Sequence, residues 1–281
     1  MNKLALGTVQ FGLDYGINNS SGQVEFNEVN KILNLLKINK IDTVDTASSY
    51  GNCEKILGKI GISNFNVITK TLPLRYGVNN VIKTFYQSLE NLKVPAIDGL
   101  LIHNFSDVKH EEFDSLYKEL CILKDHKVIN KIGFSIYNPM QANFLLNNFD
   151  FDLIQAPLNV FDVRLINSGI LGKLKRNKIK VHARSVFLQG LLLNFKELDE
   201  YFFRWKNQFN EYQKIVEMSN LSLLEYALNF VLNIKDIDKV IVGVNSERQL
   251  IEIIQTKIYK DILDGFPIND LKLLNPSEWK I

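Results

Sequence analysis

The stretch Val44-Asp45-Thr46-Ala47-Ser48-Ser49-Tyr50-Gly51-Asn52-Cys53-Glu54-Lys55-Ile56-Leu57-Gly58 contains the pattern that decides the fold. A short β-branched run ends at Asp45, a polar turn with a glycine follows, and helical periodicity begins at Cys53. The same order of strand, turn and helix recurs along the whole chain. Because alternating strands and helices with short connections form a parallel sheet, the pattern indicates an α/β protein.

Eight such strands are predicted, and the spacing between them suits one strand, one helix and two loops per unit. The predicted strands are Leu4–Gly7, Asp42–Asp45, Asn66–Lys70, Gly99–His103, Lys131–Phe134, Leu153–Gln155, Lys180–Arg184 and Lys239–Gly243. The predicted helices are Glu28–Asn39, Cys53–Ile60, Asn79–Leu92, Glu112–His126, Met140–Asn147, Leu165–Arg176, Leu223–Leu232 and Glu247–Lys257. Eight units favour a closed (β/α)8 TIM barrel, one domain over residues 1–281. An open doubly wound sheet is the alternative, disfavoured because no G-x-G-x-x-G turn follows the first strand.

One connection is much longer than the others. It follows the seventh strand, covers about residues 191–221 and contains the aromatic-rich segment Glu197–Trp205. Loops at the carboxyl end of a barrel often carry function, so the connection is a candidate lid or substrate wall. The alternative is an extra helix that packs Phe202, Phe203 and Trp205 on the outside of the barrel.

The composition narrows the class of protein. Of 281 residues, 46% are hydrophobic and 23% are charged, and 33 basic against 31 acidic residues give a net charge of +2. This balance is typical of a globular protein and predicts neither a nucleic-acid partner nor attraction to an anionic membrane. Two cysteines cannot build a disulfide framework or a zinc site by themselves, and we predict no metal. Without a signal-type or membrane-spanning apolar run, the chain is predicted to be soluble and cytoplasmic, and its oligomeric state is left open.

Four polar residues stand at or just after predicted strand ends. Asp45, Lys70 and His103 end the second, third and fourth strands, and Tyr50 follows Asp45 by five residues. Each alone has a structural explanation, such as a cap, a surface lysine or a packed ring. Together they suit an acid catalyst: the lysine favours the phenolate and lowers the tyrosine pKa, the aspartate pairs the lysine, and the histidine orients a carbonyl oxygen.

The quoted stretch resembles the signature of the aldo-keto reductase superfamily, and the resemblance covers the rest of the chain. Leu6-Gly7-Thr8 resembles the first strand of that family, Ile132-Gly133-Phe134-Ser135 the fifth, and Gln155 with Asn159 the sixth. Arg184–Leu191 is similar to the motif at the seventh strand and Ile241-Val242-Gly243 to the eighth. The resemblance implies reduction of an aldehyde or ketone by NAD(P)H, with Tyr50 as general acid, Lys70 and Asp45 tuning it, and His103 orienting the carbonyl.

The resemblance also implies a cofactor site that needs no Rossmann domain. Ser135 and Gln155 would hold the nicotinamide, and the motif after the seventh strand would follow the pyrophosphate. The residues it assigns to the cofactor are Gly7, Thr8, Asp45, Ser135, Gln155, Arg184, Ser185, Phe187, Gln189, Gly190, Gly243, Ser246, Arg248, Gln249 and Glu252.

NADPH is the predicted cofactor, with NADH possible. The helix after the eighth strand begins near Asn245–Arg248, and its free N–H groups and positive dipole end can receive a phosphate. Arg248 can add a charged hydrogen bond to that phosphate. Alternatively, Arg248 pairs with Glu247 or Glu252.

Two positions depart from the family pattern. Ile136 stands where many members have asparagine after the serine of the fifth strand. Arg184 stands where many members place an aromatic ring on the nicotinamide, and a planar guanidinium can also stack.

The substrate is predicted to be a small carbonyl compound, of sugar type or anionic. The predicted pocket wall consists of Val9, Phe11, Tyr15, Tyr137, Phe161 and Arg164. Two of only six arginines, Arg164 and Arg184, follow the sixth and seventh strands, which suits an anionic substrate. In the alternative, Arg164 pairs with Asp162 or Asp152 and Arg184 serves the cofactor.

Two other functions are compatible with the same residues. One is a barrel lyase or aldolase in which Lys70 forms a Schiff base, which requires a neutral lysine free of Asp45. The other is a cofactor-binding regulatory subunit that turns over slowly.

Overall fold

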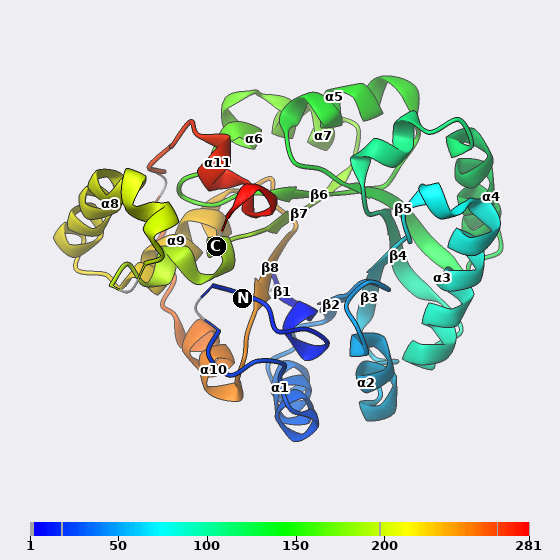
Figure 1. The fold of residues 1–281 in the computed structure, drawn as a ribbon, viewed down its shortest axis with the longest axis horizontal. Coiled ribbons are helices and arrows are strands. Elements are labelled where there is room, and N and C mark those ends of the chain that lie inside the picture. Colours follow the sequence, from blue (N-terminus) through cyan, green and yellow to red (C-terminus); the bar gives the residue numbers. More distant parts are fainter. Residues whose placement is uncertain (1–2, 18, 197, 263, 281) are drawn as a thin grey trace.

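Eight parallel strands close into a barrel in the order in which they occur in the sequence (Figure 1). The computed structural model describes residues 3–17, 19–196, 198–262 and 264–280. The strands are β1 (Leu4–Gly7), β2 (Thr43–Asp45), β3 (Asn66–Lys70), β4 (Ile97–Ile102), β5 (Ile129–Ser135), β6 (Leu153–Pro157), β7 (Lys180–Arg184) and β8 (Lys239–Gly243). The first and last strands pair in register, with Gly7 opposite Gly243, so the sheet has no free edge. This is the predicted (β/α)8 barrel.

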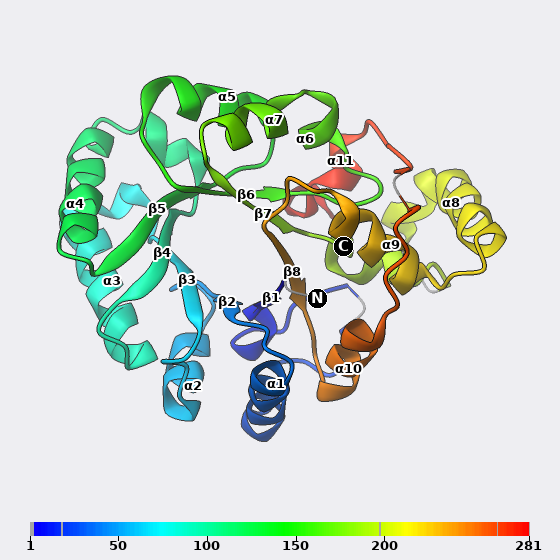
Figure 2. The same cartoon turned by 180° about the vertical axis from the view of Figure 1, so that it is seen from behind.

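Helices surround the barrel on all sides, as Figures 1 and 2 show from opposite ends. They are α1 (Phe26–Ile38), α2 (Cys53–Ile60), α3 (Val78–Leu92), α4 (Phe113–Asp125), α5 (Pro139–Asn148), α6 (Arg164–Asn167), α7 (Ile170–Arg176), α8 (Lys206–Met218), α9 (Leu223–Asn233), α10 (Glu247–Gln255) and α11 (Leu271–Leu274). Short 3-10 turns, η1 to η6, cover Val9–Phe11, Leu74–Tyr76, Phe105–Lys109, Leu188–Leu193, Glu200–Trp205 and Pro276–Glu278. None of these helices, within the described ranges, is long and apolar enough to cross a membrane.

The inside of the barrel is filled by side chains. Ile68, Leu101 and Leu153 form a separate buried cluster in its centre. A glycine at position 133 lets these side chains approach, because a Cβ there would lie 2.5 Å from Leu101 Cδ2. Polar side chains follow this apolar layer at the carboxyl ends of the strands, where active sites of such barrels lie.

Helix α2 is held on the barrel by two residues of the quoted motif. Glu54 is buried and its carboxylate accepts a hydrogen bond of 2.8 Å from Thr69 Oγ1 on β3. Gly58 packs against α3 so closely that a Cβ would lie 2.0 Å from the carbonyl oxygen of Asn91. Part of the motif therefore builds the fold and takes no part in the chemistry.

The structure divides one predicted helix. Leu165–Arg176 was expected as a continuous helix, but α6 ends at Asn167 and α7 begins at Ile170. Gly169 between them has φ +70°, a left-handed conformation that glycine adopts at low cost and that a helix cannot contain.

The long connection after β7 packs on the outside of the barrel over most of its described length. Phe202 and Trp205 are buried, and Phe202 contacts Trp279 near the C-terminus with ring centroids 4.9 Å apart. Trp205 Nε1 donates to Asp270 at 3.1 Å, while Phe203 is exposed. The predicted alternative of a segment packed on the outside of the barrel therefore holds for η5 and α8. Residue 197 of the predicted aromatic segment lies outside the described residues.

Candidate active site

A cavity of about 570 Å³ opens at the carboxyl ends of the strands. This volume is in the usual range for small-molecule and cofactor sites. Most of the predicted site residues line it together. They are Gly7, Thr8, Val9, Tyr15, Asp45, Tyr50, Lys70, His103, Ser135, Tyr137, Gln155, Arg184, Ser185, Phe187, Gln189, Gly190, Gly243, Gln249 and Glu252.

A buried ion pair lies at one end of the cavity. Lys70 Nζ is 2.6 Å from Asp45 Oδ1 and also donates to the carbonyl oxygen of Thr46 at 2.8 Å. Burial opposes the charge on Lys70, but Asp45 and Tyr50 outweigh it, so the pKa of Lys70 is raised. Gln155 Nε2 donates to the other carboxylate oxygen of Asp45 at 2.7 Å. The lysine is therefore held as a cation beside the tyrosine.

Tyr50 is packed against this pair, with its ring centroid 5.2 Å from Lys70 Nζ. Burial raises the pKa of Tyr50, and Lys70 opposes the rise without cancelling it. Lys70 acts in the predicted direction, since it lowers the pKa of Tyr50, but the effect of burial is larger and was not counted in the prediction. Tyr50 consequently keeps its proton at neutral pH, as a proton donor must.

His103 completes the group across from Tyr50. The two ring centroids are 6.4 Å apart and the ring planes nearly perpendicular, at 82°. Burial, assisted by the charge on Lys70, lowers the pKa of His103 to about 4. The imidazole is therefore neutral at pH 7 and is suited to hydrogen bonding with an uncharged carbonyl.

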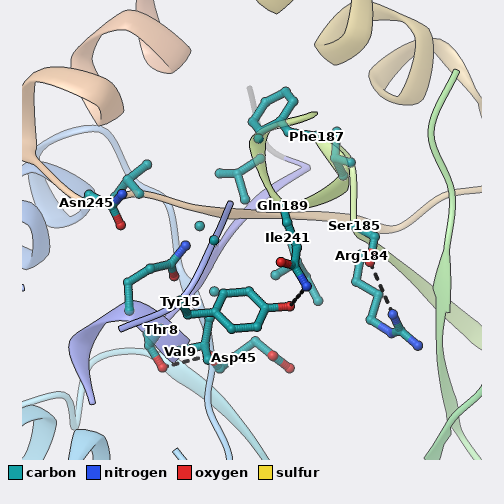
Figure 3. A pocket seen from close by; sticks show the side chains of 18 of the residues that line it. Thr8, Val9, Tyr15, Asp45, Arg184, Ser185, Phe187, Gln189, Ile241 and Asn245 are labelled. Atoms are coloured by element: carbon teal, nitrogen blue, oxygen red, sulfur yellow. Dashed lines mark hydrogen bonds between the residues drawn. The ribbon is translucent and has the colours of Figure 1, made fainter. Parts of the chain in front are cut away.

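Arg184 lies at the end of β7 on the same cavity (Figure 3). Its guanidinium stacks on the Tyr137 ring at 4.4 Å and donates to the Ile136 carbonyl at 3.0 Å and to Ser185 Oγ at 3.2 Å. Within the described ranges, no aspartate or glutamate forms an ion pair with it. An arginine that is partly buried without an acidic partner is well placed to meet an anion.

Three of the predicted pocket residues do not line the cavity. Phe11 and Phe161 are almost fully buried, and Phe161 packs against Tyr212 at 5.1 Å between ring centroids. Arg164 forms an ion pair of 2.6 Å with Asp162, whose side chain is only 2% exposed. The pocket assignment is corrected for these three, since the first two belong to the core and the third neutralises a buried carboxylate.

The predicted cofactor residues that follow β8 are divided in the same way. Gln249 and Glu252 line the cavity, whereas Ser246 and Arg248 do not. Ser246 caps α10 by accepting a hydrogen bond from the Gln249 amide at 3.3 Å. Arg248 is 88% exposed in its side chain and pairs with Glu252 at 3.1 Å. Arg248 thus forms the ion pair with Glu252 that was predicted as the alternative, and its role toward the cofactor stays a prediction.

Polar residues that sequence reasoning missed also line the cavity. Gln10 follows β1 and Asn245 follows the neighbouring strand β8, and each has a buried side-chain oxygen with no hydrogen-bond partner. Unsatisfied buried acceptors of this kind are costly unless a ligand supplies donors. A ligand with hydroxyl and amide groups, such as a dinucleotide, fits them. The sequence held no signal for Gln10, and Asn245 was noted only as the start of the helix after the eighth strand.

A bridge of two side chains crosses the cavity in Figure 3. Gln189 Nε2 donates to the Tyr15 hydroxyl at 3.0 Å. The segment that carries Gln189 has left-handed backbone at Ser185, Leu188, Gln189 and Gly190, with φ between 47° and 94°. Such conformations are costly for residues other than glycine and typically occur at ligand sites.

Comparisons with known proteins concern the family and the fold. A model of the aldo/keto reductase family matches residues 3–258. The holo form of an aldo-keto reductase from Bacillus halodurans is similar in structure, with TM-score 0.72 and 17% identity over 93% of this chain and 95% of the other. Glycerol dehydrogenase from Gluconobacter oxydans has TM-score 0.71 and 22% identity over 92% and 88%.

A search of curated proteins gave no match. The solved structures establish the fold, and the family model covers almost the whole of the chain. The chain belongs to the aldo/keto reductase family and is an NAD(P)H-dependent oxidoreductase built on a (β/α)8 barrel.

Proposed function

We propose that this enzyme reduces an aldehyde or ketone that carries an anionic group, with Tyr50 as the proton donor. The observation that supports the reaction is the buried Lys70–Asp45 ion pair against the Tyr50 ring. When bound, a reduced nicotinamide cofactor supplies the hydride. The protein then has to orient the carbonyl and deliver one proton to its oxygen.

Tyr50 is suited to that transfer in both of its states. Before transfer its raised pKa keeps the hydroxyl protonated. After transfer the phenolate lies beside the Lys70 ammonium, which is fixed by Asp45 and the Thr46 carbonyl. A fixed cation stabilises the developing negative charge without reorganisation, which is the main electrostatic contribution to such catalysis. Neutral His103 orients the carbonyl oxygen toward the tyrosine.

The test of this role is Tyr50→Phe, which removes the hydroxyl and keeps the ring. The rate of carbonyl reduction should fall by roughly 10²–10⁴-fold, the usual contribution of a general acid. The dissociation constant of the cofactor should be nearly unchanged, because Tyr50 contacts the carbonyl oxygen. Full activity in the variant would refute the assignment.

The anionic group is proposed from Arg184. A substrate carboxylate or phosphate would accept hydrogen bonds from those N–H groups of the Arg184 guanidinium that do not contact Tyr137, Ile136 or Ser185. The proposal is tested with 4-carboxybenzaldehyde and uncharged benzaldehyde as substrates. In Arg184→Met the KM for the charged aldehyde should rise roughly ten- to 150-fold, the equivalent of about 1.5–3 kcal/mol, and the KM for benzaldehyde should change little.

Arg75→Met is the matched control, because Arg75 is exposed and lies away from the cavity. It should leave both KM values unchanged. Cofactor affinity is measured in parallel. If Arg184→Met weakens the cofactor and spares the ratio of the two KM values, Arg184 serves the cofactor instead.

The Schiff-base alternative finds no support in the site. A nucleophilic lysine must be neutral, whereas Lys70 is paired with Asp45 and its pKa is raised. A slow regulatory subunit would have the same cavity, so turnover with an aldehyde separates it from an enzyme. The predicted preference for NADPH depended on Arg248, which pairs with Glu252. The proposed reaction therefore requires only a reduced nicotinamide dinucleotide, NADPH or NADH.

A further inference from the structure

The Tyr15 hydroxyl is a hydrogen-bond donor on the wall of the cavity. Tyr15 belongs to the segment between η1 and α1 and lines the same cavity as Tyr50 and Arg184. Its oxygen accepts the hydrogen bond of 3.0 Å from Gln189 Nε2 that Figure 3 shows. A phenol also has one proton to donate, and within the described ranges no protein group accepts the proton of Tyr15. A ligand in the cavity can therefore accept it.

This hydroxyl interacts with the groups on which the proposed reaction depends. Its electrostatic interactions are with Tyr50, Arg184 and Tyr137. Burial raises the pKa of Tyr15, and Tyr50 adds to the rise while the Arg184 cation opposes it. The hydroxyl consequently keeps its proton at neutral pH and remains a neutral donor. A ligand whose carbonyl lies at Tyr50 can thus meet the Arg184 cation and the Tyr15 donor at the same time.

Gln189 directs this donor. The N–H group of the amide occupies a lone pair of the Tyr15 oxygen, so the hydroxyl proton turns toward another acceptor. The same hydrogen bond polarises the hydroxyl and makes it a stronger donor. Gln189 has φ 56°, a left-handed backbone conformation that is costly for residues other than glycine and is typical of ligand clamps.

Arg184 and Tyr15 together suit one anionic group. Arg184 is partly buried and forms no ion pair among the described residues. An anion that leaves water needs further hydrogen bonds besides its cation, because its remaining lone pairs are otherwise unsatisfied. A carboxylate or phosphate has several oxygens, so one can accept from the guanidinium while another accepts from the phenol.

We propose that Tyr15 is a specificity-determining residue, which binds the anionic group of the substrate together with Arg184 and is positioned by Gln189. The inference rests on the proposed function, where the anionic group was assigned from Arg184 alone. It gives the anion site two walls, one from β7 and one from the segment after η1. The substrate is then a carbonyl compound whose carboxylate or phosphate fits between these two elements.

Binding of the alcohol product tests the inference without turnover. 4-(Hydroxymethyl)benzoate and uncharged benzyl alcohol are titrated by calorimetry into the enzyme saturated with NADPH or NADH, so that no reaction occurs. In Tyr15→Phe the dissociation constant of the charged alcohol should rise roughly ten- to 150-fold, the range for a hydrogen bond to a charged group. The dissociation constants of benzyl alcohol and of the cofactor should change little.

A double-mutant cycle tests the positioning role of Gln189. Gln189→Leu keeps the Tyr15 hydroxyl but removes its partner, so the charged alcohol should bind several-fold more weakly. The double variant with Tyr15→Phe should bind it no more weakly than Tyr15→Phe does, because the amide acts through the hydroxyl. Additive losses would overturn the positioning role.

Tyr76→Phe is the matched control, since Tyr76 is 50% exposed and does not line the cavity. It should leave both dissociation constants unchanged. Equal weakening of the two alcohols in Tyr15→Phe, a loss confined to the cofactor, or no change at all would overturn the inference. If Arg184→Met weakens the charged alcohol and Tyr15→Phe does not, the proposed anionic group stands and only this inference fails. Equal affinity of the wild type for both alcohols, or binding of neither, would refute both.

Discussion

Variants of the buried Lys70–Asp45 ion pair should separate its contribution to stability from its contribution to activity. Lys70→Met removes the ammonium and keeps an unbranched apolar side chain of similar length. The carboxylate of Asp45 then loses its 2.6 Å partner and keeps, among the described residues, the hydrogen bond from Gln155. We expect both the melting temperature and the rate of carbonyl reduction to fall.

The size of the stability loss follows from burial. The side chains are 2% and 6% exposed, so solvent cannot replace the lost partner. Removing one member of a buried ion pair costs about 3–5 kcal/mol. For a protein somewhat above 250 residues, each kcal/mol shifts the melting temperature by roughly 2–4 °C, so calorimetry should record a decrease of about 6–20 °C.

The double variant Asp45→Asn with Lys70→Met distinguishes an unpaired charge from lost packing. Without a buried charge the double variant should regain roughly half or more of the lost stability, because a neutral replacement of a buried pair is often tolerated. Its activity should stay as low as that of the single variant, since nothing then stabilises the phenolate. A single variant that melts within about 1 °C of wild type, or a double variant that melts no higher than the single one, refutes the reasoning.

Two further predictions concern acid stability and packing. Burial lowers the pKa of His182 from 6.5 to about 4. At pH 5 the unfolded chain therefore binds more protons at this residue than the folded chain does, and the free energy of unfolding should be about 2 kcal/mol lower than at neutral pH. Urea unfolding at pH 7 and pH 5 measures this loss of unfolding free energy, and in His182→Gln the loss should be smaller by that amount. In the control His126→Gln, where the histidine is exposed, the loss should match that of the wild type. Equal losses in all three proteins would contradict the reasoning. Gly58→Ala should destabilise the protein by about 1–3 kcal/mol or more, since its Cβ would lie 2.0 Å from the Asn91 oxygen. The control is Gly172→Ala in α7, where the new Cβ would meet only the flexible Arg176 side chain at 3.6 Å and should stabilise the protein by about 0.5–1 kcal/mol. Similar effects at both glycines would show that packing does not set the difference.

Most of the fold could be predicted because strand and helix have different hydrophobic periods. Strands β1, β3, β7 and β8 have the predicted bounds, and helix α2 does also. The break between α6 and α7 was not predicted. It depends on Gly169, and a single glycine inside a helical pattern does not reveal its backbone conformation. The sequence did not decide whether the long connection after β7 forms a lid or packs on the outside of the barrel. Its position depends on contacts with Asp270 and Trp279, which are far away in the sequence.

The site could be predicted where its residues end strands. Side chains alternate along a strand, so Lys70, Ser135, Gln155 and Arg184 continue the inward-facing rows of their strands and reach the cavity. The pKa of Tyr50 could not be predicted, because its direction depends on how much the surrounding side chains bury the ring.

Beyond the last strand residue the alternation ends, and that explains the errors at the pocket wall. Phe11 and Phe161 each follow a strand end by four residues and turn into the core, whereas Tyr50 follows β2 by five residues and lines the cavity. Arg164 follows β6 at the mouth, but Asp162 two residues earlier neutralises it, whereas Arg184 belongs to β7 and forms no ion pair among the described residues. The same distinction applies at α10, where Glu252 pairs with Arg248 from one turn away. Arginine at a barrel mouth therefore indicates an anion site only when no nearby carboxylate takes its charge, and this condition leaves Arg184 and removes Arg164 and Arg248.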